Sequence, residues 1–231
     1  MICSDKGWIR AARGHIENEA EIKYKEGDHS KFVLRCETTD RLLIFASNGR
    51  FYSAGVDKLP GGRGFGEPLR LMFDLPNEHD IVQLLVHRPQ GGRLLVASDD
   101  GRGFVVEESE VVAQTRAGKQ VMSLAEGARA VVAAPVAGDA VAAVGTNHKL
   151  LVFDLEEVPV MARGRGVTLQ RYKDGRLSDA VTFTKKEGLS WRQSGGRTRT
   201  ETDLAMWIGK RGQTGRVAPR GFPRNDRFAA V

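Results

Sequence analysis

Arginine and glycine stand side by side in several segments of this 231-residue chain that are too rich in glycine to form helices. The segments are ARGH at residues 12–15, GGRGFGEP at 61–68, QTRAGKQ at 114–120 and ARGRGV at 162–167. A guanidinium group pairs with phosphate through two parallel hydrogen bonds, and glycine allows the backbone to come close to a duplex. The pattern therefore predicts phosphate contacts.

Positive charge is concentrated in the last third of the chain. Residues 161–231 contain 16 Lys or Arg against 6 Asp or Glu, a net charge of +10, whereas residues 1–160 contain 19 against 23, a net charge of −4. Such an asymmetry indicates a polyanionic partner, and the sequence shows no helix that could read bases. We therefore expect sequence-tolerant phosphate contacts with duplex DNA, although a solvated basic surface is the alternative for any single residue. The predicted DNA-binding residues are Arg13, Arg63, Arg116, Lys119, Arg163, Arg165, Arg171, Lys173, Arg176, Lys185, Lys186, Arg192, Arg197, Arg199, Lys210 and Arg211.

No pattern for catalysis or metal binding is found. The histidines, at positions 15, 29, 79, 87 and 148, are scattered and lack the spacing of metal ligands. Asp99 and Asp100 precede Gly101, so hairpin-turn chemistry explains them. GGRGFG is not followed by a helical pattern, as a dinucleotide-binding loop would be. The sequence thus predicts no catalytic residue, no metal site and no cofactor in this chain.

Cys3 and Cys36 are isolated, which predicts buried apolar thiols in a reducing compartment rather than a disulfide or zinc site. No apolar run approaches the ~18 residues that a membrane-spanning helix needs. The first ten residues, MICSDKGWIR, lack the basic-then-apolar order of a signal peptide. These features predict a cytoplasmic location.

A short apolar strand followed by a polar turn recurs along the chain. The copies are MICSDKGWIRAA, LLIFASNGRFYSA from Leu42, LLVASDDGRGFVV from Leu94 and AVAAVGTNHKLLVF from Ala140. Gly7, Gly49, Gly101 and His148 occupy equivalent turn positions, 42, 52 and 47 residues apart, and are predicted to have positive φ. Four-stranded units of this length are typical of propeller blades.

We therefore predict an all-β, propeller-like disc in one domain over residues 1–231, with about five four-stranded blades. The approximate blades are residues 1–41, 42–93, 94–139, 140–188 and 189–231. The last blade is irregular and is expected to leave the ring open. Its poorer copy of the motif reads DLAMWIG, a turn at KRGQTG, and Arg220-Gly221-Phe222 as a repeat of Arg63-Gly64-Phe65. Trp8, Trp191 and Trp207 are expected to anchor the core between blades.

At these motifs the sequence resembles the carboxy-terminal domains of the bacterial type IIA topoisomerase A subunits. The matching segments are SDKGWIRAARGH, YKEGD, SNGRFYS with LPGGRGFGEPL, and RGVTLQRYKDGRLSDAVTF with LSW, so the resemblance covers essentially the whole chain. It is greatest to the topoisomerase IV branch (ParC). The gyrase wrapping box has only an incomplete counterpart, QTRAGKQ, in the third predicted blade, and no acidic tail follows Pro223, so gyrase-type wrapping is not expected.

The resemblance implies a β-pinwheel, in which neighbouring blades exchange strands and the outer rim bends or guides duplex DNA. Such a domain would guide the transported segment for decatenation and supercoil relaxation during chromosome segregation. The implied partners are DNA, the ATPase subunit ParE in a heterotetramer, and the amino-terminal cleavage region of the same subunit. The cleavage tyrosine, ATP and Mg²⁺ would belong to those other parts, and this chain would be an excised, monomeric domain. The implied location is the cytoplasm at the nucleoid, with a holoenzyme peripheral to the inner membrane as an alternative.

A second function class remains open on the sequence. A propeller-like scaffold for protein interactions would account for the repeats equally well, and for the acidic first two-thirds somewhat better. The +10 charge of residues 161–231, coincident with Arg-Gly loops, favours DNA binding instead.

Overall fold

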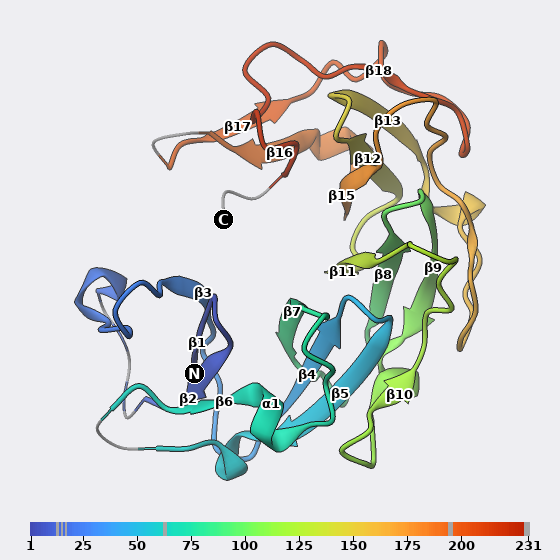
Figure 1. The fold of residues 1–231 in the computed structure, drawn as a ribbon. Helices are drawn as coiled ribbons and strands as arrows, with labels where there is room; N and C mark the ends of the chain where they lie inside the picture. The colour runs from blue at the N-terminus through green and yellow to red at the C-terminus, as the bar shows by residue number, and fades with distance from the viewer. Residues whose placement is uncertain (13, 15, 17, 62–63, 194–195, 229–231) are drawn as a thin grey trace.

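Five β-sheets follow one another around an open arc in the computed structural model of the chain (Figure 1). The structure describes residues 1–12, 14, 16, 18–61, 64–193 and 196–228, so Arg13 and Arg63 lie outside the described residues. Four sheets have four strands each and the fifth has two in the described part of the chain. All strand pairs within the sheets are antiparallel, and the predicted all-β class and five-unit arrangement are confirmed.

Each sheet is built around a tight hairpin. The first sheet, in the order β3-β1-β2-β6, contains Ser30–Val33, Ile2–Ser4, Trp8–Arg10 and Glu67–Pro68. The second, β10-β5-β4-β7, contains Lys119–Gln120, Arg50–Gly55, Arg41–Ala46 and Ile81–Val86. The third, β11-β8-β9-β14, contains Ala130–Pro135, Arg93–Ser98, Arg102–Glu107 and Val167–Thr168. The fourth, β15-β12-β13-β18, contains Leu177–Phe183, Ala140–Gly145, Lys149–Asp154 and Arg216–Val217, and the fifth pairs β16 (Leu189–Arg192) with β17 (Thr198–Glu201).

Helical structure in the described residues is limited to single turns. The one α-helical turn is α1, Leu69–Met72, and the 3₁₀ turns are η1 to η5, at Glu19–Glu21, Val56–Lys58, Glu108–Val111, Leu155–Glu157 and Lys185–Glu187. No helix in this part of the chain is long and apolar enough to cross a membrane.

The four hairpin turns share the geometry predicted from the repeat. Gly7, Gly49, Gly101 and His148 have φ values of 79°, 76°, 83° and 59°. Each donates its backbone N–H to the carbonyl three residues earlier, at 3.0, 2.9, 2.9 and 2.9 Å. Residues other than glycine rarely have positive φ, but histidine is among the types that adopt it more often. His148 therefore takes the turn position that glycine occupies in the other three hairpins.

Neighbouring sheets exchange strands at their outer edges. After the second, third and fourth hairpins the chain goes back to the preceding sheet, adds a two-residue outer strand, and returns to form the inner strand of its own sheet; after the fifth hairpin it adds β18 to the fourth sheet. The exchanged strands β6, β10 and β18 lie on the outside of the arc and β7, β11 and β15 on the inside (Figure 1). QTRAGKQ therefore leads into the second sheet, although it follows the third hairpin.

The glycine that ends each exchange loop has a structural role. Gly118 and Gly166 precede β10 and β14 with φ of 71° and 74°, and a Cβ atom on either would overlap a carbonyl oxygen of the preceding sheet. Gly66 and Gly215 precede β6 and β18, and a Cβ atom on either would likewise overlap a carbonyl oxygen of the preceding sheet. The sequence predicts that glycine here allows close approach of the backbone to a duplex. In the structure these glycines instead allow close approach to a strand of the neighbouring sheet.

Four apolar clusters fill the interfaces between consecutive sheets. Alternate residues of one strand enter different clusters: Leu42 and Ile44 of β4 face the first sheet, while Leu43 and Phe45 face the third. This explains why the central strands are uninterrupted apolar runs, since both faces are buried. In the described residues no sheet or cluster joins the first unit to the fifth, so the ring is open.

Two details of the predicted repeat are wrong. The turn of the fifth hairpin lies between β16 and β17, whereas KRGQTG is the exchange loop before β18. Arg211 and Gly212, not Arg220 and Gly221, therefore correspond in position to the Arg-Gly pairs of the other exchange loops.

The tryptophans differ in their burial. Trp191 is 2% exposed and belongs to the cluster between the fourth and fifth sheets, which confirms its predicted anchoring role. Trp207 is half-buried against the same cluster and donates its Nε1–H to the carbonyl of Val217 at 2.8 Å. Trp8 is half-buried, with the Lys25 ammonium 3.1 Å from its ring centroid.

The two cysteines should differ in reactivity. Cys3 is fully buried in the first cluster, and burial raises the pKa of its thiol from 9.0 to about 12, whereas Cys36 is half-buried at the edge of that cluster. Because the thiolate is the reactive form, we expect one equivalent of a thiol reagent to react at pH 8 in the folded state. Cys36→Ser should abolish that reaction, while Cys3→Ser should retain it; fast labelling of the Cys36→Ser protein would contradict the burial of Cys3.

Candidate nucleic-acid interface

The predicted DNA-binding residues fall into groups that the sequence did not separate. Seven have exposed side chains that form no ion pair or hydrogen bond with another described residue: Arg163, Arg171, Lys173, Lys186, Arg192, Arg197 and Lys210. A cation that lacks a protein partner keeps its full charge for a phosphate. These seven are the strongest candidates for contacts with a polyanion.

Six other predicted residues have carboxylate partners. Arg116 pairs with Asp74 at 3.8 Å, Lys119 with Glu110 at 3.7 Å and Arg199 with Glu201 at 3.3 Å. Arg165 pairs with Asp100 at 3.4 Å, Arg176 with Asp99 at 2.9 Å, and Lys185 with Asp154. These pairs lower the positive potential at their sites, so the six residues contribute less than their number suggests.

Arg211 is a structural residue. Its guanidinium is half-buried and donates to the carbonyl of Thr168 at 2.7 Å, which ties the fourth exchange loop to β14. Arg50 and Arg102, which lie outside the prediction, do the same for other exchange loops by donating to the carbonyls of Ala117 and Gly166 at 3.0 and 2.8 Å. Some arginines beside these loops therefore hold the loops in place, whereas others are exposed. Only the exposed arginines are available to a ligand.

Exposed cations near the C-terminus were missed by the prediction. Arg216 lies on β18, and Arg220, Arg224 and Arg227 follow it; all four side chains are exposed and none pairs with a described carboxylate. They were included in the +10 charge of residues 161–231, which was the only signal for them.

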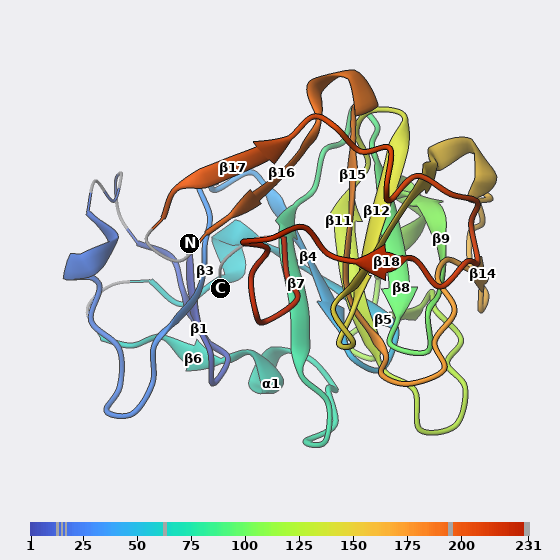
Figure 2. The same ribbon diagram turned by 90° about the horizontal axis from the view of Figure 1, so that it is seen from above.

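Four free cations lie on the outer edge of the third and fourth sheets. Arg163 lies beside the second exchange segment, since the amide of Gly164 donates to the carbonyl of Val121 at 2.9 Å, and the other three lie where the third and fourth exchange segments meet. The amide of Gly212 donates to the carbonyl of Leu169 at 2.8 Å, and the amide of Arg171 donates to the carbonyl of Gln213 at 3.1 Å. These bonds hold the third and fourth exchange segments side by side at the outside of the arc (Figure 2). We call the free cations of this edge the rim cations: Arg163, Arg171, Lys210 and Arg216.

A second group of free cations belongs to the fifth unit. Lys186 lies on η5, Arg192 ends β16, and Arg197 precedes β17. We call these three the fifth-unit cations. No described carboxylate pairs with them, so the last unit of the arc also carries unpaired positive charge.

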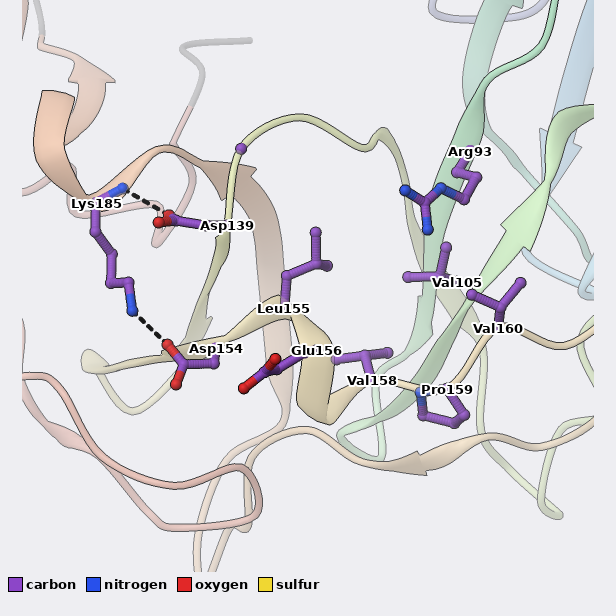
Figure 3. A pocket seen from close by; sticks show the side chains of 11 residues that line it. Arg93, Val105, Asp139, Asp154, Leu155, Glu156, Val158, Pro159, Val160 and Lys185 are labelled. Carbon is purple, nitrogen blue, oxygen red and sulfur yellow. Dashed lines mark hydrogen bonds and ion pairs between the residues drawn. The ribbon is translucent and has the colours of Figure 1, made fainter.

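A hollow lined by carboxylates is not a phosphate site. It has a volume of about 690 Å³, between the third and fourth sheets, and Asp139, Asp154 and Glu156 line it together with Arg93 and Lys185. Figure 3 shows Lys185 bridging Asp139, through its backbone N–H, and Asp154, through its ammonium group. The hydrogen bond to Asp154 raises the pKa of Lys185, and the three carboxylates make this hollow unsuited to an anion.

The histidines and Tyr172 that make side-chain contacts in the described residues connect parts of the fold. No group of three or more His, Cys, Asp or Glu among them could hold a metal ion. His87 contacts the buried carboxylate of Glu108 at 3.0 Å and His148 contacts Asp226 at 2.6 Å, and both pairs connect separate segments of the fold. Burial raises the pKa of Tyr172, whose hydroxyl donates to Gln170 at 2.7 Å, so this side chain is structural as well.

Comparison with protein families gives a match to the DNA gyrase C-terminal domain, beta-propeller, over residues 40–88, 92–137 and 147–184. The A subunit of DNA topoisomerase 4 from Rickettsia bellii is 46% identical over 229 residues, and that from Caulobacter vibrioides is 44% identical over 229 residues. The chain is covered to 99% in both alignments but spans only 31% and 30% of those proteins.

Solved structures give the same result for the fold. The E. coli ParC C-terminal domain matches with a TM-score of 0.80 and 27% identity, covering 96% of this chain and 94% of that one. A DNA gyrase A C-terminal domain matches with a TM-score of 0.66 and 15% identity, covering 98% of this chain and 78% of that one. The β-pinwheel predicted from the resemblance is confirmed by these matches and by the strand exchange.

Proposed function

This chain belongs to the DNA gyrase C-terminal domain family, in the branch of the topoisomerase IV A subunits, and we propose that it binds and bends duplex DNA with little regard to sequence. The observation that carries the proposal is the row of rim cations along the outer edge of the third and fourth sheets. Phosphate contacts from a curved rim favour DNA that follows the curve, so binding and bending are coupled.

The described geometry supports phosphate contact over base reading. The rim and fifth-unit cations lie on loops, short strands and the 3₁₀ turn η5, and the described part of the chain has no helix longer than one turn to enter a major groove. Flexible Lys and Arg side chains on such loops neutralise phosphates at any sequence. The bound DNA would be the transported segment, whose guidance assists decatenation and supercoil relaxation during chromosome segregation.

The remaining parts of the activity are proposed for the longer subunit, together with its partners. Strand cleavage would belong to the amino-terminal region of the same subunit, and ATP hydrolysis with Mg²⁺ to ParE, in a heterotetramer at the nucleoid. This domain would work without a cofactor of its own and as a monomer outside the holoenzyme. The partial neutralisation of Arg116 and Lys119, in the QTRAGKQ segment, supports bending rather than gyrase-type wrapping.

The test is equilibrium binding of the isolated chain to short duplexes of unrelated sequence across a salt series. With roughly four to six phosphates neutralised, log affinity should fall against log salt with a slope of about −4 to −5, equally for all sequences. The chain alone should neither cleave nor relax plasmid. A flat salt response, or relaxation of plasmid by the pure chain, would refute the proposal.

A protein-interaction scaffold is the second candidate, and one observation favours it. Met206, Ile208 and Val217 are 62%, 54% and 67% exposed, and the first two line a hollow of about 400 Å³ at the outer edge of the fourth sheet. Apolar side chains on a surface contribute little to phosphate binding and often mark a protein contact. Absence of DNA binding at low salt, with the fold intact, would favour this candidate.

A further inference from the structure

Two aspartates face arginines in a hollow beside the third hairpin turn. The hollow has a volume of about 480 Å³ and lies between the third and fourth units. In it Asp99 contacts Arg176 at 2.9 Å and Asp100 contacts Arg165 at 3.4 Å. The aspartates are 14% and 25% exposed and the two arginines 58% and 52%, so the carboxylates lie below cations that reach the surface.

The hairpin turn needs only one oxygen of each aspartate. Oδ1 of Asp99 accepts the backbone N–H of Arg129 at 2.9 Å, and Oδ1 of Asp100 accepts the Ser98 hydroxyl at 2.5 Å. The other oxygen, Oδ2, is the one that contacts the arginine in both pairs. The negative charges therefore form ion pairs with the arginines, whereas the turn requires only one hydrogen-bond acceptor from each aspartate.

The second and fourth turns of the repeat show that neutral residues build the same structure. Ser47 and Thr146 occupy the position of Asp99, and their hydroxyls accept the backbone N–H groups of Asp80 and Arg176, both at 3.0 Å. Asn48 and Asn147 occupy the position of Asp100, and each accepts a backbone N–H two residues later, at 3.1 and 3.3 Å. Since Ser-Asn and Thr-Asn suffice in the second and fourth turns, the paired carboxylates are specific to the third.

We propose that Asp99 and Asp100 gate a phosphate-binding site formed by Arg165 and Arg176, with the exposed Arg171 on the same hollow. A backbone phosphate of the duplex must displace both carboxylates before it can pair with these arginines. The gate lowers the affinity of the junction between the third and fourth units, so DNA binds there only when the neighbouring rim cations already hold it. This inference rests on the proposed DNA binding.

The charge balance gives the gate two measurable consequences. Two carboxylates at the site repel an incoming phosphate, and their low exposure weakens screening by salt. In addition, arginines that are already paired with aspartate contribute less to ion release when DNA binds. Removing the carboxylates should therefore both raise the affinity and steepen its salt dependence.

The experiment compares the 231-residue chain with Asp99→Ser/Asp100→Asn, which gives the third turn the two residues of the second. We expect about tenfold tighter binding of a short duplex near 0.1 M salt, and a salt slope more negative by one to two units. The matched control is Glu26→Gln/Glu37→Gln, which changes the net charge equally at two exposed carboxylates that both precede β4 and form no ion pair with a described residue. The control should change affinity less than about twofold.

A third variant distinguishes the release of the two arginines from a general effect of the more positive net charge. Adding Arg165→Ala and Arg176→Ala to the gate variant should remove the gain, because the altered turn then has no arginines to release. Equal affinities for the gate and control variants, with thermal unfolding unchanged, would overturn the inference while leaving DNA binding established. Absence of DNA binding by the unaltered chain would instead refute the proposed function itself.

Discussion

Replacing the four rim cations by glutamate will lower the affinity of this chain for duplex DNA by about 100-fold or more near 0.1 M salt. The substitutions are Arg163→Glu, Arg171→Glu, Lys210→Glu and Arg216→Glu. Each removes a cation that pairs with phosphate and places a repelling charge on the outer edge of the third and fourth sheets. If all four residues bind phosphates, the salt slope should shrink by about one unit for each phosphate that is no longer neutralised. Fluorescence anisotropy with a labelled duplex, repeated across a salt series, measures both quantities.

The control must match the change in charge without disturbing the fold. Arg88, Arg102 and Arg129 are unsuitable, since Arg88 pairs with the buried Glu108 and the other two make hydrogen bonds that connect neighbouring segments. The better control set has four exposed cations without ion pairs to described residues, away from the rim: Lys23, Arg35, Arg41 and Arg93. We expect their reversal to change affinity less than about tenfold. Equal losses of affinity in the two sets would mean that binding depends on net charge and not on the rim.

Trp191→Ala will destabilise the fifth unit by about 3–5 kcal/mol. The side chain is 2% exposed, its ring centroid lies 5.3 Å from that of Phe222, and its Nε1–H donates to the carbonyl of Gly221 at 3.3 Å. Because each unit packs only on its neighbours and no described contact closes the ring, the destabilisation should be local. Hydrogen exchange should accelerate in β16 and β17 while β4 and β8 keep their protection.

The same variant links stability to binding, since the fifth-unit cations depend on this core. DNA affinity should fall together with the order of β16 and β17, although no charge has been changed. Trp207→Ala is the matched control: Trp207 is half-buried against the same cluster, so its removal should cost roughly half as much or less. Uniform acceleration of exchange over all five sheets would show that the arc unfolds as one cooperative unit instead.

Local patterns in the sequence determined the repeat and the elements within it. The residue at the fourth position of each hairpin turn must adopt positive φ, so Gly49 and His148 are recognisable as equivalent without any structure. The apolar runs at β4, β8 and β12 likewise indicate strands buried on both faces. The net charge of residues 161–231 is a sum over the sequence and needs no coordinates. These features depend on near neighbours in the chain, which is why the all-β class and the basic last third could be predicted.

Only the tertiary structure decided which arginines are free. Arg163 and Arg211 each precede a glycine whose amide donates to the preceding exchange segment, yet Arg163 is exposed and Arg211 is bonded to the carbonyl of Thr168. Asp99 and Asp100 are turn residues, as the sequence predicts, but their second oxygens pair with Arg176 and Arg165, 77 and 65 residues further along the chain. Strand exchange brings these segments together, because each outer strand pairs with the sheet of the preceding unit. Composition and spacing record how many charges a segment carries, whereas the pairing of one charge with another depends on distances between side chains that only the folded chain sets.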